Sequence, residues 1–280
     1  MHRTLDFTNE PARFNPWVAR SIRLFAETDY LDQILEVYPF AVSPPRRLAE
    51  PLRRAITTAH INQDTSGLIS LLRGLGRFPY EDPAWHSLRT ARDAAERNPQ
   101  QLARLAANLY QMTPAELFAR LEAAPAANTQ LGPMFGAWLL QRYPRRIAVD
   151  FEQSTAGIVL FDGSEEAGKT FVRDVLRQDL DKRPDLLAKV NQTYVLGEAK
   201  WIGNSGGNQE KQVKEVLHFC AEARGNVRRV GIIDGFPWAL YNASGGTINN
   251  KETVKVQETP YPVFSALVLP DYLTSLLGSS

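Results

Sequence analysis

Two adjacent stretches decide the fold of this chain: residues 184–190, PDLLAKV, and residues 193–201, TYVLGEAKW. Both are rich in the aliphatic, β-branched and aromatic residues that favour strands. Only Asn191 and Gln192 separate them, which is the length of a tight hairpin turn. We therefore predict that residues 185–190 and 193–201 form two antiparallel strands.

This hairpin brings charged side chains together. Side chains two apart on a strand point to the same face, so Glu198 and Lys200 project together, and Asp185 on the neighbouring strand approaches Glu198. Unpaired charges are costly inside a protein, but two carboxylates can hold a divalent cation such as Mg²⁺. Lys200 would then orient or deprotonate a nucleophile. The alternative is a solvent-exposed strand face that carries a Glu–Lys pair.

A longer pattern extends beyond the hairpin. Pro184-Asp185, twelve further residues and then Glu198-Ala199-Lys200 resemble the PD-(D/E)xK motif of nucleases. Residues 206–212, GGNQEKQ, strengthen the resemblance, because some type II restriction endonucleases place a Gly-Gly-x-Gln helix start after a Gly-Glu-Ala-Lys strand. The similarity covers residues 162–270 and is specific only between 184 and 212.

The resemblance implies roles for individual residues. Asp185 and Glu198 correspond to metal ligands, together with Ala199, and Lys200 corresponds to the catalytic lysine. The implied cofactor is Mg²⁺.

The family often adds a glutamate from the preceding helix, for which Glu165 and Glu166 are the candidates. Glu165 is favoured, because it shares a helix face with apolar residues, although two solvated acids at a helix start explain the pair equally well. Gln209 and Gln212 are candidates for contacts to the phosphate or the catalytic groups, with a plain helix-start role as the alternative.

The implied function is that of a type II restriction endonuclease. Such an enzyme hydrolyses double-stranded DNA at a short sequence, usually a palindrome, and leaves 5′-phosphate and 3′-hydroxyl ends. A two-fold site predicts a homodimer, and a cognate DNA methyltransferase is the expected partner in the cell. Residues 201–209 and 242–255 are candidates for reading the bases.

The expected fold class is α/β (α+β), a restriction-endonuclease-like core with a mixed central sheet flanked by helices. This core is expected over residues 146–280, with helices at 164–180 and after Gly206-Gly207, where Asn208 would be the cap. Further strands are expected at 230–233 and 265–269.

Residues 1–145 are expected to form a mainly helical region that serves DNA recognition or dimerisation. A capping box at Thr113 and apolar residues at helical spacing support this expectation.

Composition limits the class of protein. The chain has 280 residues and a net charge of +1, which excludes a strongly basic nucleic-acid coat but permits a local basic groove. Its single cysteine, Cys220, excludes an internal disulfide and fits a reducing cytosol. No apolar run approaches about 18 residues, and no apolar segment follows the first residues, so we expect a cytoplasmic protein without membrane contact.

Another motif predicts a different enzyme class. Residues 163–170, GSEEAGKT, match the P-loop pattern of nucleotide-binding proteins, and Asp234 after an apolar run fits its second acidic motif. Glu165 and Glu166 argue against this, because negative charges do not suit a loop that cradles phosphates.

A third hypothesis, a non-catalytic DNA-binding regulator, leaves Asp185, Glu198 and Lys200 unexplained.

Overall fold

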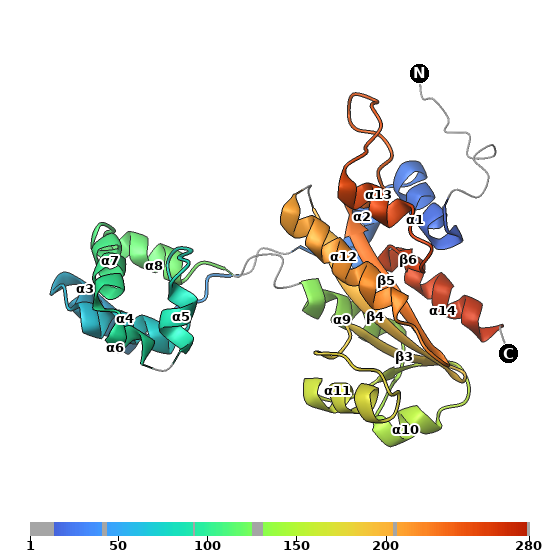
Figure 1. Ribbon diagram of the computed structural model, residues 1–280, viewed down its shortest axis with the longest axis horizontal. Helices are drawn as coiled ribbons and strands as arrows, with labels where there is room; N and C mark the ends of the chain where they lie inside the picture. Colours follow the sequence, from blue (N-terminus) through green and yellow to red (C-terminus); the bar gives the residue numbers. More distant parts are fainter. Residues whose placement is uncertain (1–13, 41–43, 92, 125–130, 204–205, 279–280) are drawn as a thin grey trace. The chain divides into compact units, whose positions relative to one another are not determined.

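The computed structural model of the protein describes residues 14–40, 44–91, 93–124, 131–203 and 206–278. They form two compact units (Figure 1). One unit joins the described residues before position 41 to those after position 126, and the other comprises the described residues between these positions. These bounds differ from the expected division at residue 145, because the apolar face of the first helix packs on the sheet of the larger unit.

The smaller unit is helical. Its core consists of aliphatic side chains at helical spacing, such as Leu105 and Leu109, which are fully buried. The predicted capping box is present: the Thr113 side chain accepts from the Glu116 N–H, and the Glu116 carboxylate accepts from the Thr113 N–H. The helices are α3 (Glu50–Ile61), α4 (Thr65–Leu75), α5 (Trp85–Thr90), α6 (Ala94–Arg97), α7 (Pro99–Tyr110) and α8 (Pro114–Leu121).

The larger unit is built on a mixed sheet, as the sequence predicts. Within the described residues, six strands lie in the order β1-β2-β3-β4-β5-β6. Neighbours β2–β3 and β3–β4 are antiparallel, and the other neighbours are parallel. The strands are β1 (Arg145–Arg146), β2 (Ile158–Phe161), β3 (Leu186–Val190), β4 (Thr193–Ile202), β5 (Val227–Gly235) and β6 (Val263–Phe264).

The predicted hairpin is confirmed, with Asn191 and Gln192 as the turn between β3 and β4.

The strand predicted at 265–269 is wrong. The extended segment there is β6, and a 3-10 turn, η5 (Ala266–Val268), follows it. The Ser265 side chain caps this turn by accepting from the Leu267 N–H. A short buried apolar run does not distinguish a strand from a helical turn by periodicity, which explains the error.

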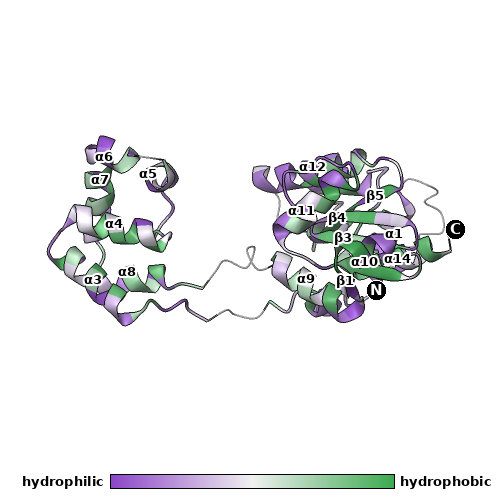
Figure 2. Ribbon diagram, turned by 90° about the horizontal axis from the view of Figure 1, so that it is seen from below, coloured by the Kyte–Doolittle hydropathy of each residue, from purple (hydrophilic) through white to green (hydrophobic). Residues whose placement is uncertain are grey.

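Helices cover both faces of the sheet. In Figure 2, α12 lies on one side of strands β3–β5, and α9 and α14 lie on the other side. The larger unit also contains the 3-10 turns η2 (Ile34–Glu36) and η4 (Phe236–Trp238). Its helices are α1 (Pro16–Glu27), α2 (Tyr30–Gln33), α9 (Leu131–Arg142), α10 (Ala148–Gln153), α11 (Glu165–Asp174), α12 (Gly207–Ala221), α13 (Lys251–Gln257) and α14 (Leu269–Leu277).

Two predicted helix boundaries are wrong. α11 ends at Asp174 instead of continuing to residue 180, and Val175 is left 39% exposed. Gly206, not Asn208, is the N-cap of α12. Asn208 lies in the first turn of α12 and is exposed, so its side chain marks the helix start only approximately.

The apolar stripe of α12 packs closely on the sheet. Val213, Val216 and Cys220 are buried, as predicted. Opposite them on β5 stands Gly231, where a Cβ would lie 2.6 Å from a methyl carbon of Val216. The absence of a side chain at this position therefore allows α12 to lie against the strands that carry the candidate site.

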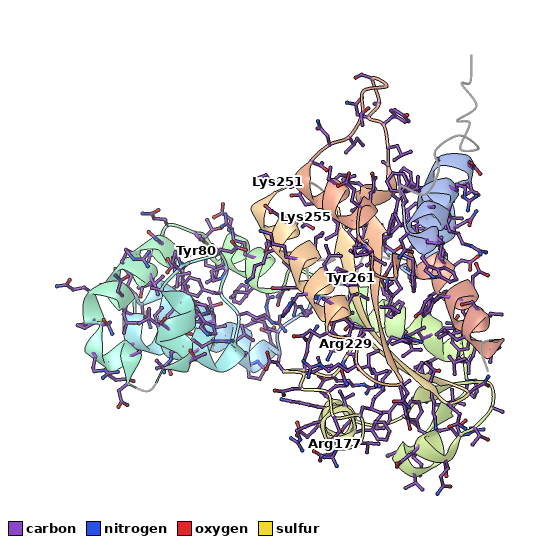
Figure 3. All side chains as sticks on the ribbon, turned by 45° about the vertical axis from the view of Figure 1, so that its right-hand side comes forward. Tyr80, Arg177, Arg229, Lys251, Lys255 and Tyr261 are labelled. Carbon is purple, nitrogen blue, oxygen red and sulfur yellow. The ribbon has the colours of Figure 1, made fainter. Side chains whose placement is uncertain are left out.

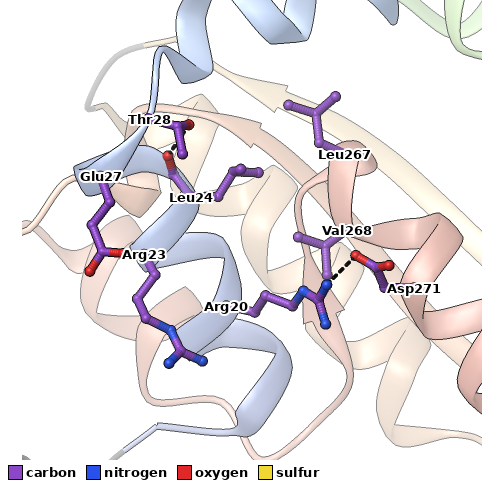
Figure 4. A pocket seen from close by; sticks show the side chains of 8 residues that line it. All are labelled: Arg20, Arg23, Leu24, Glu27, Thr28, Leu267, Val268 and Asp271. Atoms are coloured by element: carbon purple, nitrogen blue, oxygen red, sulfur yellow. Dashed lines mark hydrogen bonds and ion pairs between the residues drawn. The ribbon is translucent and has the colours of Figure 1, made fainter. Parts of the chain in front are cut away.

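α1 and α14 meet at the surface of the larger unit. Arg20 of α1 and Asp271 of α14 form an ion pair of 2.6 Å at one wall of a shallow groove (Figure 4). Both side chains are about half exposed, so the pair contributes little stability.

Among the described helices, none is long and apolar enough to cross a membrane.

Candidate active site

The end of the β3–β4 hairpin positions the first candidate residues. The ladder ends with the pair Leu186 and Gly197, so Ala199 extends past Leu186, the first residue of β3. Its N–H donates instead to Oδ2 of Asp185, at 2.9 Å. The N–H and C=O of one strand residue point to the same side, so the Ala199 carbonyl faces the edge where Asp185 lies.

Glu198 and Lys200 share the face of β4 that α11 and α12 cover. Glu198 is 7% exposed and is therefore a buried carboxylate that needs a counter-charge. Its Oε1 accepts from the Lys200 Nζ at 2.8 Å and from the Lys182 Nζ at 2.5 Å. The three predicted residues Asp185, Glu198 and Lys200 thus lie together, and Lys182 from the loop before β3 joins them.

Burial and the neighbouring charges shift the pKa values of Asp185 and Lys182. The pKa of Asp185 is raised, first by burial and then by the negative charge of Glu198. The Ala199 N–H and the two lysines oppose that rise. For Lys182, burial lowers the pKa, but its hydrogen bond to Glu198 and the nearby Asp185 charge outweigh burial and raise it overall. Two close carboxylates that repel each other are balanced here by two ammonium groups.

The oxygen atoms at this edge fit a hard divalent cation. Among the described residues, Oδ1 of Asp185 and Oε2 of Glu198 accept no hydrogen bond, and both are free to ligate. With the Ala199 carbonyl they form a set of oxygen donors, the kind that Mg²⁺ prefers, with water as its remaining ligands. No cluster of three or more acidic, histidine or cysteine side chains suited to a metal occurs in the described ranges. Two carboxylates and a carbonyl are therefore the protein ligands available.

Glu165 lies near the site but has another partner. Its Oε1 accepts from the backbone N–H of Arg183 at 3.0 Å. Arg183 in turn donates from its guanidinium to the carbonyls of Gly163 and Phe161. Glu165 thus anchors the loop that leads to Asp185, whereas Glu166 is exposed on the first turn of α11. The structure does not bring either glutamate into one cluster with Asp185 and Glu198.

Gln209 and Gln212 are half-buried in the first turns of α12, beside the end of β4. Oε1 of Gln209 is buried and has no hydrogen-bond partner among the described residues.

The two segments predicted to read bases meet at this end of α12. Glu252 of α13 accepts from the Gly206 N–H at 2.9 Å. Lys255, labelled in Figure 3, donates to Glu210 at 2.6 Å. Residues 204 and 205 of the first segment lie outside the described residues.

The P-loop hypothesis receives no support from residues 163–170, which are all described. Ser164 caps α11 by accepting from the Ala167 N–H, and the Gly168 N–H donates to the Ser164 carbonyl at 3.0 Å. Gly168 and Lys169 are therefore inside a helix, whereas a P-loop directs its N–H groups at phosphate.

The proposed second acidic motif also has a structural role. Asp234 is fully buried and accepts from the hydroxyls of Tyr30 and Tyr38 at 3.0 Å each and of Ser265 at 2.6 Å. Burial raises its pKa to about 6.

Comparison with known proteins identifies the family. The sequence model of the Tsp45I type II restriction enzyme family matches residues 15–276. The chain belongs to this family. The match spans both compact units, and no curated protein or solved structure matches the chain.

Membership of the Tsp45I family makes the chain a site-specific deoxyribonuclease that binds DNA and acts in restriction-modification. It also confirms the expectation of a type II restriction endonuclease. Type II restriction enzymes generally use divalent metal ions, which agrees with the oxygen donors at the end of the β3–β4 hairpin.

Sequence reasoning missed two features of this restriction enzyme. Lys182 lies in a loop, where no periodicity applies, and its place three residues before Asp185 was the only available signal. The contacts of Tyr30 and Tyr38 with Asp234 join residues about 200 positions apart, which no local pattern reveals.

Proposed function

We propose that the chain is a Mg²⁺-dependent type II restriction endonuclease with Asp185, Glu198 and Lys200 as its catalytic residues. It hydrolyses phosphodiester bonds of double-stranded DNA at a short palindromic sequence and leaves 5′-phosphate and 3′-hydroxyl ends. The observation that carries the proposal is the hydrogen bond from the Ala199 N–H to Asp185, because it joins the two halves of the PD…ExK pattern at one open edge.

Asp185, Glu198 and the Ala199 carbonyl are the groups that would hold the ion. Their free oxygens are of the type that Mg²⁺ selects. Bound there, the cation supplies charge neutralisation at the phosphate and acidifies water. These groups lie at the edge where β3 begins and β4 continues.

The side chains divide the remaining tasks. Lys200 donates to the attacking water or to the phosphate and so fixes the position of the nucleophile. Glu198, at 2.8 Å from the Lys200 Nζ, holds this side chain in place until DNA arrives. Gln209 offers an unpaired amide oxygen beside the site, and we assign it and Gln212 to supporting contacts. Glu165 acts indirectly, by holding the Arg183 loop.

Further partners follow from the chemistry of the substrate. A palindromic site has two-fold symmetry, which suits a homodimer. The helical unit between positions 41 and 126 is assigned to DNA recognition or dimer contacts. Residues 201–209 and 242–255 are assigned to base reading, which needs amides or cations in a groove. A cytoplasmic enzyme of this kind needs a cognate methyltransferase to protect the DNA of its own cell.

A cleavage assay with Asp185→Asn tests the proposal. The wild-type protein should cut plasmid DNA at discrete positions with Mg²⁺ and not with a chelator, and end sequencing then reports the site and the ends. Asp185→Asn should cut at least about 100-fold more slowly, because it removes a charged ligand of the metal. Asp174→Asn is the control, since Asp174 is exposed and pairs with Arg173. Normal cleavage by Asp185→Asn contradicts the site.

A further inference from the structure

The Glu198 carboxylate binds a second ammonium group in addition to that of the proposed catalytic lysine. Its Oε1 accepts from two ammonium groups, Lys200 at 2.8 Å and Lys182 at 2.5 Å. Lys200 is fixed on the central strand β4 and is 24% exposed. Lys182 lies on the loop before β3, and its side chain is 55% exposed although its ammonium reaches a buried carboxylate. The two lysines are therefore held with very different freedom.

Lys182 is placed so that its side chain alone can move. The next residue, Arg183, is anchored by three hydrogen bonds: from its N–H to Glu165, and from its guanidinium to the carbonyls of Gly163 and Phe161. These bonds fix the backbone beside Lys182, while the half-exposed side chain lies in solvent on one side. The ammonium can leave Glu198 without any rearrangement of the loop.

The charges at the site favour such a departure when metal binds. Two carboxylates, Asp185 and Glu198, face two ammonium groups, Lys182 and Lys200, so the formal charges of the group sum to zero. A divalent cation on the same carboxylates, with one scissile phosphate, restores neutrality only if one ammonium leaves. A hard cation binds carboxylate oxygens at about 2.0–2.1 Å, so an ammonium on the same carboxylate would lie close to it and repel it.

On this basis we propose that Lys182 is a resident counter-ion of the active site, whose ammonium occupies Glu198 until a divalent cation displaces it. Lys182 and the metal then compete for one carboxylate. The inference rests on the proposed function, since it takes Glu198 as a metal ligand. It adds a residue that the PD…ExK pattern does not contain, and it predicts that a lysine weakens metal binding in the free enzyme.

Binding of Mn²⁺ to the full chain without DNA tests this competition. The free-ion signal in electron paramagnetic resonance reports the bound fraction, so no catalytic readout is involved. Lys182→Met keeps the length of the side chain and removes its charge, and it should lower the Kd for Mn²⁺ on the order of tenfold. Lys182→Arg keeps the competing charge and should leave the Kd within about threefold of wild type.

The control is Lys211→Met, which removes one charge from an exposed position of α12 where Lys211 is 75% exposed. It should change the Kd less than twofold. A Kd for Lys182→Met that is unchanged or higher overturns the inference, provided that the variant melts like wild type. Glu198→Gln separates the two proposals. If Glu198→Gln does not weaken Mn²⁺ binding, the metal site and the inference both fail. If Glu198→Gln weakens binding and Lys182→Met has no effect, only the role of Lys182 is wrong.

Discussion

Replacement of Lys200 by methionine separates catalysis from stability at this site. The substitution keeps the side-chain length and removes the ammonium that lies 2.8 Å from Glu198 Oε1. In most buried ion pairs, removal of one partner leaves an uncompensated charge and costs about 3–5 kcal/mol. Here Lys182 still donates to the same oxygen at 2.5 Å, so Glu198 does not become an unpaired charge. The free energy of unfolding should therefore fall by no more than about 1 kcal/mol.

The effect on catalysis should be much larger. A positioned group that takes part in proton transfer contributes about 10²- to 10⁴-fold to the rate, which corresponds to about 3–5 kcal/mol of barrier. Lys200→Met should lose this factor in the cleavage rate. Sequence-specific DNA binding should stay within a few-fold of wild type, because in the proposed mechanism Lys200 acts at the scissile phosphate and reads no base.

Three measurements on Lys200→Met test whether Lys200 is catalytic or structural. They are single-turnover cleavage with Mg²⁺, DNA binding with Ca²⁺, and unfolding by urea. Lys211→Met, on the exposed face of α12, is the matched control for loss of one positive charge. Retention of more than a few per cent of the wild-type rate would refute the catalytic assignment. A loss of about 3 kcal/mol or more in unfolding free energy would show instead that Lys200 is structural and that Lys182 does not compensate Glu198.

Two further predictions concern Asp234 and Lys169. Asp234 is fully buried with a pKa raised from 3.8 to about 6, so its proton binds the folded state more tightly than the unfolded state. This contribution is complete below pH 3.8 and is lost as the pH rises through about 6. It amounts to about 1 kcal/mol at pH 5 and about 3 kcal/mol at full protonation. Urea unfolding from pH 8 to pH 4 should show this gain for wild type relative to Asp234→Asn, and parallel pH profiles would contradict it. Lys169 lies in the second turn of α11, so Lys169→Ala should leave cleavage within a few-fold of wild type, without an ATP requirement. ATP hydrolysis that disappears with Lys169→Ala would instead support a P-loop.

The hairpin was predictable because its signals are local. A two-residue turn between two runs of strand-favouring residues set the strand pair, and the spacing of two placed Glu198 and Lys200 on one face. The capping box at Thr113 was equally local, since it involves residues three positions apart. The strand expected at 265–269 failed because a short buried apolar run does not distinguish a strand from a helical turn, and the residues there form a 3-10 turn whose cap, Ser265, also bonds the distant Asp234.

The candidate site shows the same division. The PD…ExK pattern selected Asp185, Glu198 and Lys200, and the structure brings them together. The position of Glu165 was not predictable. Its carboxylate accepts from the Arg183 N–H, and this contact depends on where the loop after α11 returns to the sheet. Sequence spacing states which residues share an element, but it does not state which elements meet.

The sequence by itself predicted a type II restriction endonuclease, the hairpin and the charged residues at its end, because the motif between residues 184 and 212 depends on neighbours within about 30 residues. Tertiary structure alone decided which N–H the Asp185 carboxylate binds, that Lys182 shares Glu198 with Lys200, and that Tyr30 and Tyr38 reach Asp234. The physical reason is that a buried carboxylate must find a donor or a counter-charge. Any nearby segment can supply that partner, and only the packing of the whole unit determines which segment does.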